Sequence, residues 1–177
     1  MTIHVIIPPS FLQAPFFIDE AQQIAYNEAQ SFLETMENGY FVYDILTTKE
    51  AVYEPWNDQE ITIPAAFQMW KQEKEKIALL FRERKRKEAR QPMIQFIAHL
   101  ISVLHWMNGT PVVTLHSIKE ELECLALKPV NVSERMTFIM EQPDHYHSFI
   151  QLSELYEEVE KLFTKMMIMQ KKTSPNQ

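Results

Sequence analysis

The sequence predicts an all-α fold, a single-domain bundle of six to seven helices with an extended, proline-containing N-terminal arm. Three observations support this prediction. Apolar residues recur at the helical period of 3.6 in several long segments, alternating strand patterns are nearly absent, and the chain has only 2 glycines in 177 residues. We expect residues 1–18 to form the arm, packed on the body, residues 19–171 to form the helical bundle, and residues 172–177 to be a disordered tail.

The arm is predicted from its prolines and its apolar side chains. Each proline favours extended backbone in the residue before it, so the first 17 residues cannot be helical throughout. Eight apolar side chains are too many to leave in water, and we therefore expect the arm to be ordered in a groove of the body. These residues are Ile3, Val5, Ile6, Ile7, Phe11, Leu12, Phe16 and Phe17.

A first helix is predicted over Asp19–Met36, where the apolar residues keep the helical period. Gly39 lies where a C-terminal cap would be. Residues 40–52 are compatible with either a helix or a strand, and Glu54–Asp58 are expected to form a loop.

Two long helices are predicted next. The first begins at Thr62 or Ile63 and ends near Arg90. The second begins with Pro92 and is closed by Gly109. It should be the central helix of the bundle, because it lies in a long stretch without Asp, Glu, Lys or Arg.

Three further helices complete the prediction. Ser117 and Glu120 have capping-box spacing and should open a short helix, and a second short helix is expected over Ser133–Met140. The last helix should start near Pro143 and carry apolar residues at alternating spacings of three and four. The lone Cys124 is expected to be a small buried residue. Core positions are predicted at Trp70, Phe81, Leu104, Tyr156 and Phe163.

Composition excludes many classes of enzyme. Two glycines cannot build a dinucleotide fingerprint, a phosphate-binding loop or a nucleophile elbow. One cysteine excludes paired-cysteine zinc sites and an internal disulfide, and no histidine is followed by glutamate as helical zinc proteases require. No cofactor is expected. The chain shows neither a signal peptide nor a sufficiently long apolar span, so we expect a cytoplasmic protein without a membrane partner.

A polar arc on the predicted central helix is the first candidate site. Gln95, His99, Ser102 and His105 fall within about 120° of the helix circumference, and the rest of the helix is apolar. The arc could face water, or it could line an internal pocket. In a pocket, the two imidazoles could perform acid–base chemistry near neutral pH.

The start of the last helix offers ligand-like spacing at Glu141, Asp144, His145 and His147. The spacing assures only two converging ligands, and Pro143 interrupts one pair. A transition metal needs three or four ligands, so we expect no metal here. The alternative is that the acidic residues complement the positive end of the helix dipole.

A basic run is the third feature. It contains Arg82, Arg84, Lys85, Arg86, Lys87 and Arg90, whereas the chain outside residues 82–90 has 11 basic and 22 acidic residues. Such a run could bind an anionic partner, either nucleic acid or an acidic protein surface. It could equally be a solvated helix end, because no aromatic residue follows Phe81 to stack on bases.

Short proline-aromatic strings resemble a known family. Ile6-Ile7-Pro8-Pro9-Ser10-Phe11, Ala14-Pro15-Phe16-Phe17 and Glu54-Pro55-Trp56 before a long charged helix are similar to the YpoC-like proteins of the Bacillus group. The resemblance implies a cytoplasmic helical protein and supplies no catalytic residues to transfer.

The function that we expect is therefore a non-enzymatic helical module that binds another protein. Two alternatives remain open. The basic run could serve a nucleic-acid-associated protein, and the histidines of the central helix, or residues 141–147, could form a small-molecule or metal site. The sequence does not identify the partner or the oligomeric state.

Overall fold

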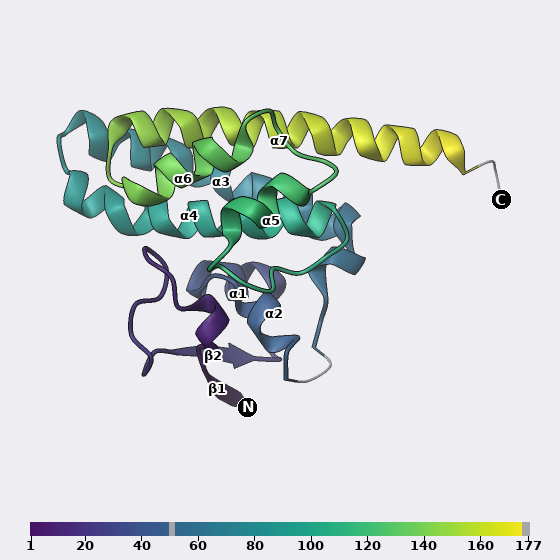
Figure 1. Ribbon diagram of the computed structural model, residues 1–177, viewed down its shortest axis with the longest axis horizontal. Coiled ribbons are helices and arrows are strands. Elements are labelled where there is room, and N and C mark those ends of the chain that lie inside the picture. The colour runs from purple at the N-terminus through teal and green to yellow at the C-terminus, as the bar shows by residue number, and fades with distance from the viewer. Residues whose placement is uncertain (50–51, 175–177) are drawn as a thin grey trace.

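The computed structural model describes residues 1–49 and 52–174. Three long helices, α3 (Gln59–Arg82), α4 (Arg86–Met107) and α7 (Tyr146–Thr173), form one layer with the shorter helices α5 (Ile118–Cys124) and α6 (Val132–Glu141). A smaller N-terminal layer packs against this bundle on the side of α4, as Figure 1 shows. The described residues contain seven α-helices, which confirms the mostly helical, single-domain fold.

The N-terminal layer contains the only sheet in the described part of the chain. Strand β1 (Thr2–Ile6) pairs antiparallel with β2 (Gln23–Asn27), and Val5 lies opposite Ile24. The 3-10 turn η1 (Pro9–Phe11) follows β1, and its Phe11 is completely buried. Of the eight apolar side chains of the arm, five are buried in the core, whereas Ile3 and Ile6 are exposed. The five are Val5, Ile7, Phe11, Phe16 and Phe17.

The helix predicted over residues 19–36 is wrong. Strand β2 lies in its first part. Ile24 and Tyr26 of this strand are buried and the residue between them is exposed, which is the two-residue period of a strand and not the period of a helix. Only α1 (Phe32–Asn38) is helical. It begins with a capping box in which Ser31 Oγ accepts from the Glu34 amide and Glu34 accepts from the Ser31 amide.

The segment after α1, which the sequence left as either helix or strand, contains a short helix. Helix α2 (Val42–Leu46) is completely buried, and residues 50–51 lie outside the described residues. Gly39 is the C-cap of α1, as predicted, and its backbone there is extended. A Cβ atom at Gly39 would lie 2.9 Å from Val42 Cγ2, so glycine allows α2 to turn back closely. The 3-10 turn η2 (Pro55–Asn57) then leads into α3.

The two long helices do not divide where the sequence predicted. Helix α3 ends at Arg82 and α4 begins at Arg86, with Arg84 in the turn at φ 60°. The predicted boundaries at Arg90 and Pro92 are therefore wrong. Pro64 and Pro92 both lie inside helices, where each loses one backbone hydrogen bond.

Helix α4 is the central helix, as predicted. Every residue from Phe96 to Met107 is buried, and Gly109 follows the helix in the left-handed region at φ 78°. The five predicted core residues are all buried, and the rings of Trp70 and Tyr156 stack with centroids 4.6 Å apart. Helices α3 and α7 thus cover α4 through an aromatic seam.

Smaller differences concern the C-terminal elements. Cys124 is exposed, so its predicted burial is wrong. Ser117 precedes α5 as expected but makes no side-chain capping bond. Helix α7 begins at Tyr146, three residues after Pro143, and continues to Thr173, so the predicted tail is helical at its start and otherwise lies mostly outside the described residues. Among the residues described, no helix combines the length and apolar content that crossing a bilayer requires.

Candidate functional site

The polar arc of α4 holds the N-terminal layer against the bundle. Gln95 donates from Nε2 to two carbonyl oxygens in the last turn of α1, at 3.1 and 2.9 Å. His99 Nε2 lies 3.3 Å from the Gly39 carbonyl oxygen, and Ser102 Oγ donates to the Asp44 carboxylate at 3.0 Å. The arc therefore contacts protein: His99 and Ser102 are buried, and Gln95 also borders a surface cavity of about 210 Å³.

Both histidines of the arc are buried. His105 Nδ1 lies 2.9 Å from the Ile101 carbonyl oxygen of its own helix, and a carbonyl can only accept, so Nδ1 carries the proton. The remaining nitrogens, His99 Nδ1 and His105 Nε2, are buried without a hydrogen-bond partner. Burial lowers the pKa of His99 to about 4. Neither ring is exposed to solvent, so the geometry gives them a packing role.

Asp44 is a buried residue that sequence analysis missed. Its carboxylate accepts from Trp106 Nε1 at 3.0 Å, from the Val112 amide at 2.8 Å and from Ser102 Oγ. Burial raises the pKa of Asp44 and outweighs the three hydrogen bonds, which lower it. The signal was present in the sequence, because Asp44 is the one charged residue in the apolar run from Phe41 to Leu46.

The basic run lies at the turn between α3 and α4, and half of it is engaged in ion pairs. Arg86 and Arg90 each lie 3.7 Å from the Asp144 carboxylate, and Lys85 lies 2.8 Å from Glu83. The other three cations are exposed and form no ion pair within the described residues. They are Arg82, Arg84 and Lys87.

The residues with metal-like spacing are held by other contacts. The Asp144 carboxylate forms ion pairs with Arg86 and Arg90, and its backbone carbonyl accepts a hydrogen bond from Arg86 Nε. The His147 ring lies edge-on to Phe138 at 5.5 Å. Across residues 1–49 and 52–174, no group of three potential ligands could hold a metal ion. Glu141 instead borders a groove of about 500 Å³ between the arm, α5 and α6, which Arg90 also lines.

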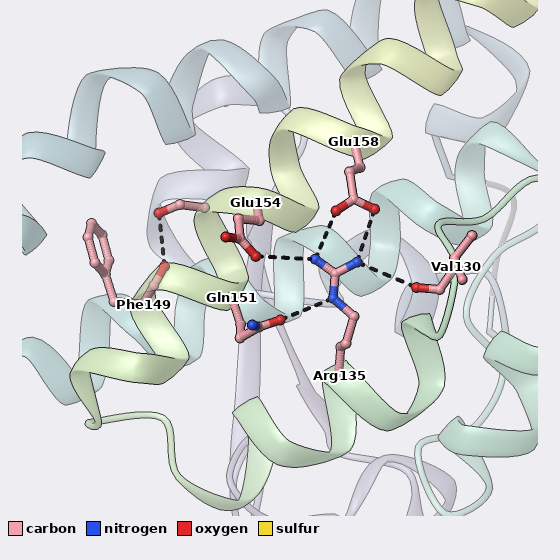
Figure 2. A network of polar contacts seen from close by, with 7 residues as sticks. Val130, Arg135, Phe149, Gln151, Glu154 and Glu158 are labelled. Atoms are coloured by element: carbon pink, nitrogen blue, oxygen red, sulfur yellow. Dashed lines mark hydrogen bonds and ion pairs between the residues drawn. The ribbon is translucent and has the colours of Figure 1, made fainter.

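A salt-bridge network attaches the acidic half of α7 to α6. Figure 2 shows the Arg135 guanidinium between two carboxylates of α7, at 2.9 Å from Glu158 and 3.8 Å from Glu154. The contact with Glu158 is bidentate, and Arg135 also donates to Gln151 and to the Val130 carbonyl oxygen. One arginine is thus shared by two of the glutamates of α7.

The other two glutamates of α7 pair with α3. Glu160 lies 2.6 Å from Lys71, and Glu157 lies 3.6 Å from Lys74. Every acidic residue of α7 therefore lies beside a cation of a neighbouring helix, and the three cations offset most of the charge of the four glutamates.

The remaining part of α7, residues 161–173, is called the α7 end below. It contains four exposed lysines and no acidic residue, and none of these lysines forms an ion pair within the described residues. In Figure 1 this part of the helix projects past the other helices. The lysines are Lys161, Lys165, Lys171 and Lys172.

Apolar side chains lie among these lysines. Ile168 is 51% exposed and Met169 is 57% exposed, whereas Met167 is half-buried. Met167 also lines a groove of about 520 Å³ between the α7 end and the start of α3, whose Ile61 is 65% exposed. The α7 end therefore presents a cationic surface with an apolar centre, which the segregation of Glu and Lys in the sequence could have indicated.

Comparisons with known proteins assign the chain to a family. The model of a family described as YpoC-like protein matches residues 60–171. The chain belongs to the YpoC-like family. The uncharacterised protein YpoC of Bacillus subtilis (strain 168) is 30% identical over 144 residues, which is 81% of this chain and 87% of that protein. No solved structure matches the chain. The predicted resemblance is confirmed, and the matched residues of this YpoC-like chain span α3 to most of the α7 end.

Proposed function

We propose that this YpoC-like protein is a cytoplasmic, non-enzymatic module that binds another protein, and that the α7 end is its binding surface. The observation that supports the proposal is the exposure of Ile168 and Met169 on a projecting helix. Apolar side chains gathered on one exposed surface favour association, and methionine adapts its shape to different partners. An amphipathic helix binds an apolar surface groove through its own apolar side chains at helical spacing.

The alternative sites have less support. Arg86 and Arg90 of the basic run are engaged by Asp144, which leaves a smaller free charge for nucleic acid. His99 and His105 are 1% and 2% exposed, so a small-molecule substrate could not reach either ring without displacing the N-terminal layer. A protein-binding role needs neither group.

Site-specific photo-crosslinking tests the proposal. A photoreactive amino acid replaces Ile168 in one variant and Ile18, which is 80% exposed in the N-terminal layer, in a matched control. Both variants are produced in Bacillus subtilis and irradiated in living cells. We expect discrete protein adducts from position 168 and none of the same size from position 18. The absence of adducts at 168, or identical adducts at both positions, would contradict the proposal.

A further inference from the structure

We propose that the partner presents an acidic amphipathic helix to the α7 end, with its apolar side chains on Ile168 and Met169 and its carboxylates on the flanking lysines. This inference rests on the proposed function and names the chemistry of the partner. It depends on the distribution of paired and unpaired charges along α7.

Charge on α7 is divided by position. All four glutamates lie before Lys161 and pair with Lys71, Lys74 or Arg135 of the neighbouring helices. All four lysines lie in the α7 end and have no ion-pair partner among the described residues. The chain as a whole has a net charge of −7, whereas the α7 end is positively charged. An acidic partner would supply the opposite charge that the body does not.

The helix dipole accounts for only part of this pattern. Cations stabilise a helix within its last turn, which explains Lys171 and Lys172. Lys161 and Lys165 lie two or more turns before the end of the helix at Thr173, where the effect of the dipole has faded. These two lysines therefore need a different explanation.

The geometry of the outer face fits a helix as ligand. Lys161 lies seven residues before Ile168, Lys165 lies three residues before it, and Lys172 lies four residues after it. These spacings place all four side chains on one face of α7. A groove of about 740 Å³ follows this face of α7. Glu157 and Glu160 also line it, and their carboxylates are paired with Lys74 and Lys71 of α3. A partner helix laid along it would bury its apolar stripe on Ile168 and place Glu or Asp side chains within reach of the three ammonium groups.

Three other kinds of partner fit less well. Single-stranded nucleic acid stacks its bases on aromatic side chains, and the α7 end has only Phe163, which is buried in the core. A helix that lies in a membrane surface has a broad apolar face, commonly with Trp or Phe, whereas most of the outward face here is lysine. A second copy of the chain would bring α7 glutamates that already have partners.

Binding of designed peptides tests the inference. The probe is a fluorescent peptide of about 20 residues with Leu at helical spacing and Glu elsewhere, and the controls are a scrambled peptide and one with Lys in place of Glu. The variant Lys161→Gln/Lys165→Gln/Lys172→Gln removes three charges from the α7 end. The matched variant Arg82→Gln/Arg84→Gln/Lys87→Gln removes three unpaired charges from the α3–α4 turn. Glutamine is a comparable helix former, and thermal unfolding verifies that both variants fold.

We expect fluorescence anisotropy to show binding of the acidic helical peptide only. The lysine variant should bind about tenfold more weakly, as expected when three exposed ion pairs are lost, and the matched variant should bind as the wild type does. Ile168→Ser should also weaken binding, and added salt should reduce the difference between wild type and lysine variant.

Several outcomes would overturn the inference. Equal losses in the two triple variants would show general electrostatic attraction, and equal binding of the scrambled peptide would exclude recognition of an apolar stripe. The inference would also be overturned if the peptide did not bind and the same lysines were required for binding phosphatidylglycerol vesicles or an oligonucleotide. A lysine-dependent dimer detected by sedimentation, without peptide binding, would overturn it as well. Adducts at position 168 together with failure of the acidic peptide would refute this inference alone, whereas absence of adducts would refute the proposed function.

Discussion

Replacement of Asp44 by alanine should be strongly destabilising, because its carboxylate is the acceptor for three buried donors. The Ser102 hydroxyl can rotate toward another acceptor. The Trp106 Nε1–H and the Val112 amide cannot, and each would be left buried without a partner. An unsatisfied buried donor costs about 1–3 kcal/mol, so the two together predict a loss of about 2–6 kcal/mol in the free energy of unfolding. That is a large part of the roughly 5–15 kcal/mol of a typical domain.

Asp44→Asn provides the matched comparison. Its amide oxygen can accept from Trp106 and Val112, and its amide nitrogen can donate to Ser102 Oγ. Since burial raises the pKa of Asp44, a neutral side chain avoids the desolvation cost that the carboxylate bears. We expect Asp44→Asn to change the free energy of unfolding by about 1 kcal/mol or less.

Urea unfolding followed by circular dichroism and tryptophan fluorescence measures both variants. The expected result is a large decrease in the midpoint for Asp44→Ala at an unchanged slope, and a small one for Asp44→Asn. If Asp44→Ala lost less than about 1 kcal/mol, or if both variants lost the same amount, the cost assigned to unsatisfied donors would be refuted.

The remaining predictions concern pH, packing and nucleic acid. Because the pKa of His99 is about 4 in the folded protein and 6.5 ordinarily, the unfolded chain binds more protons between these values. Stability should therefore fall by up to about 3 kcal/mol as the pH decreases from 6.5 to 4, and His99→Gln should flatten this dependence of the urea midpoint. Leu104→Ala should cost about 2–5 kcal/mol, and an unchanged denaturation midpoint would contradict the packing of α4. Labelled duplex DNA, titrated at two salt concentrations, should show no measurable association with the protein at near-physiological salt. If the basic run made four phosphate contacts, the logarithm of the binding constant would instead fall with the logarithm of the salt concentration with a slope near −4. Changing residues 84–87 to Gln would then abolish that binding.

The wrong predictions share a cause. The apolar residues of 19–36 fit a helix, yet Ile24 of this segment pairs with Val5 of strand β1. Nothing within residues 19–36 indicates that β1 is available for pairing. The turn at Glu83–Lys85 is another example, because a charged segment without glycine or proline carries no local stop signal. It closes because α3 and α4 pack antiparallel on each other and on α7.

The candidate site was only partly accessible from the sequence. Spacing placed Gln95, His99 and Ser102 on one face, but it could not show that this face meets the backbone of α1 and the Asp44 carboxylate. Likewise, the sequence shows that the four glutamates of α7 precede its four lysines. That the glutamates are paired and the lysines are not follows from Arg135 of the preceding helix α6 and from Lys71 and Lys74 of α3, which is separated from α7 by three other helices.

The sequence by itself determined the helical class, the central position of α4 and the identity of its core residues, because these follow from local periodicity and from a long stretch without charge. The tertiary structure decided the strand pairing, the role of the polar arc and which charges of α7 stay free. Each of these depends on partners distant in the chain: Gln95 meets Met36 across 59 residues, and Asp44 meets Val112 across 68. Such contacts form only when the whole chain has folded, since their energies depend on burial that no single segment can provide.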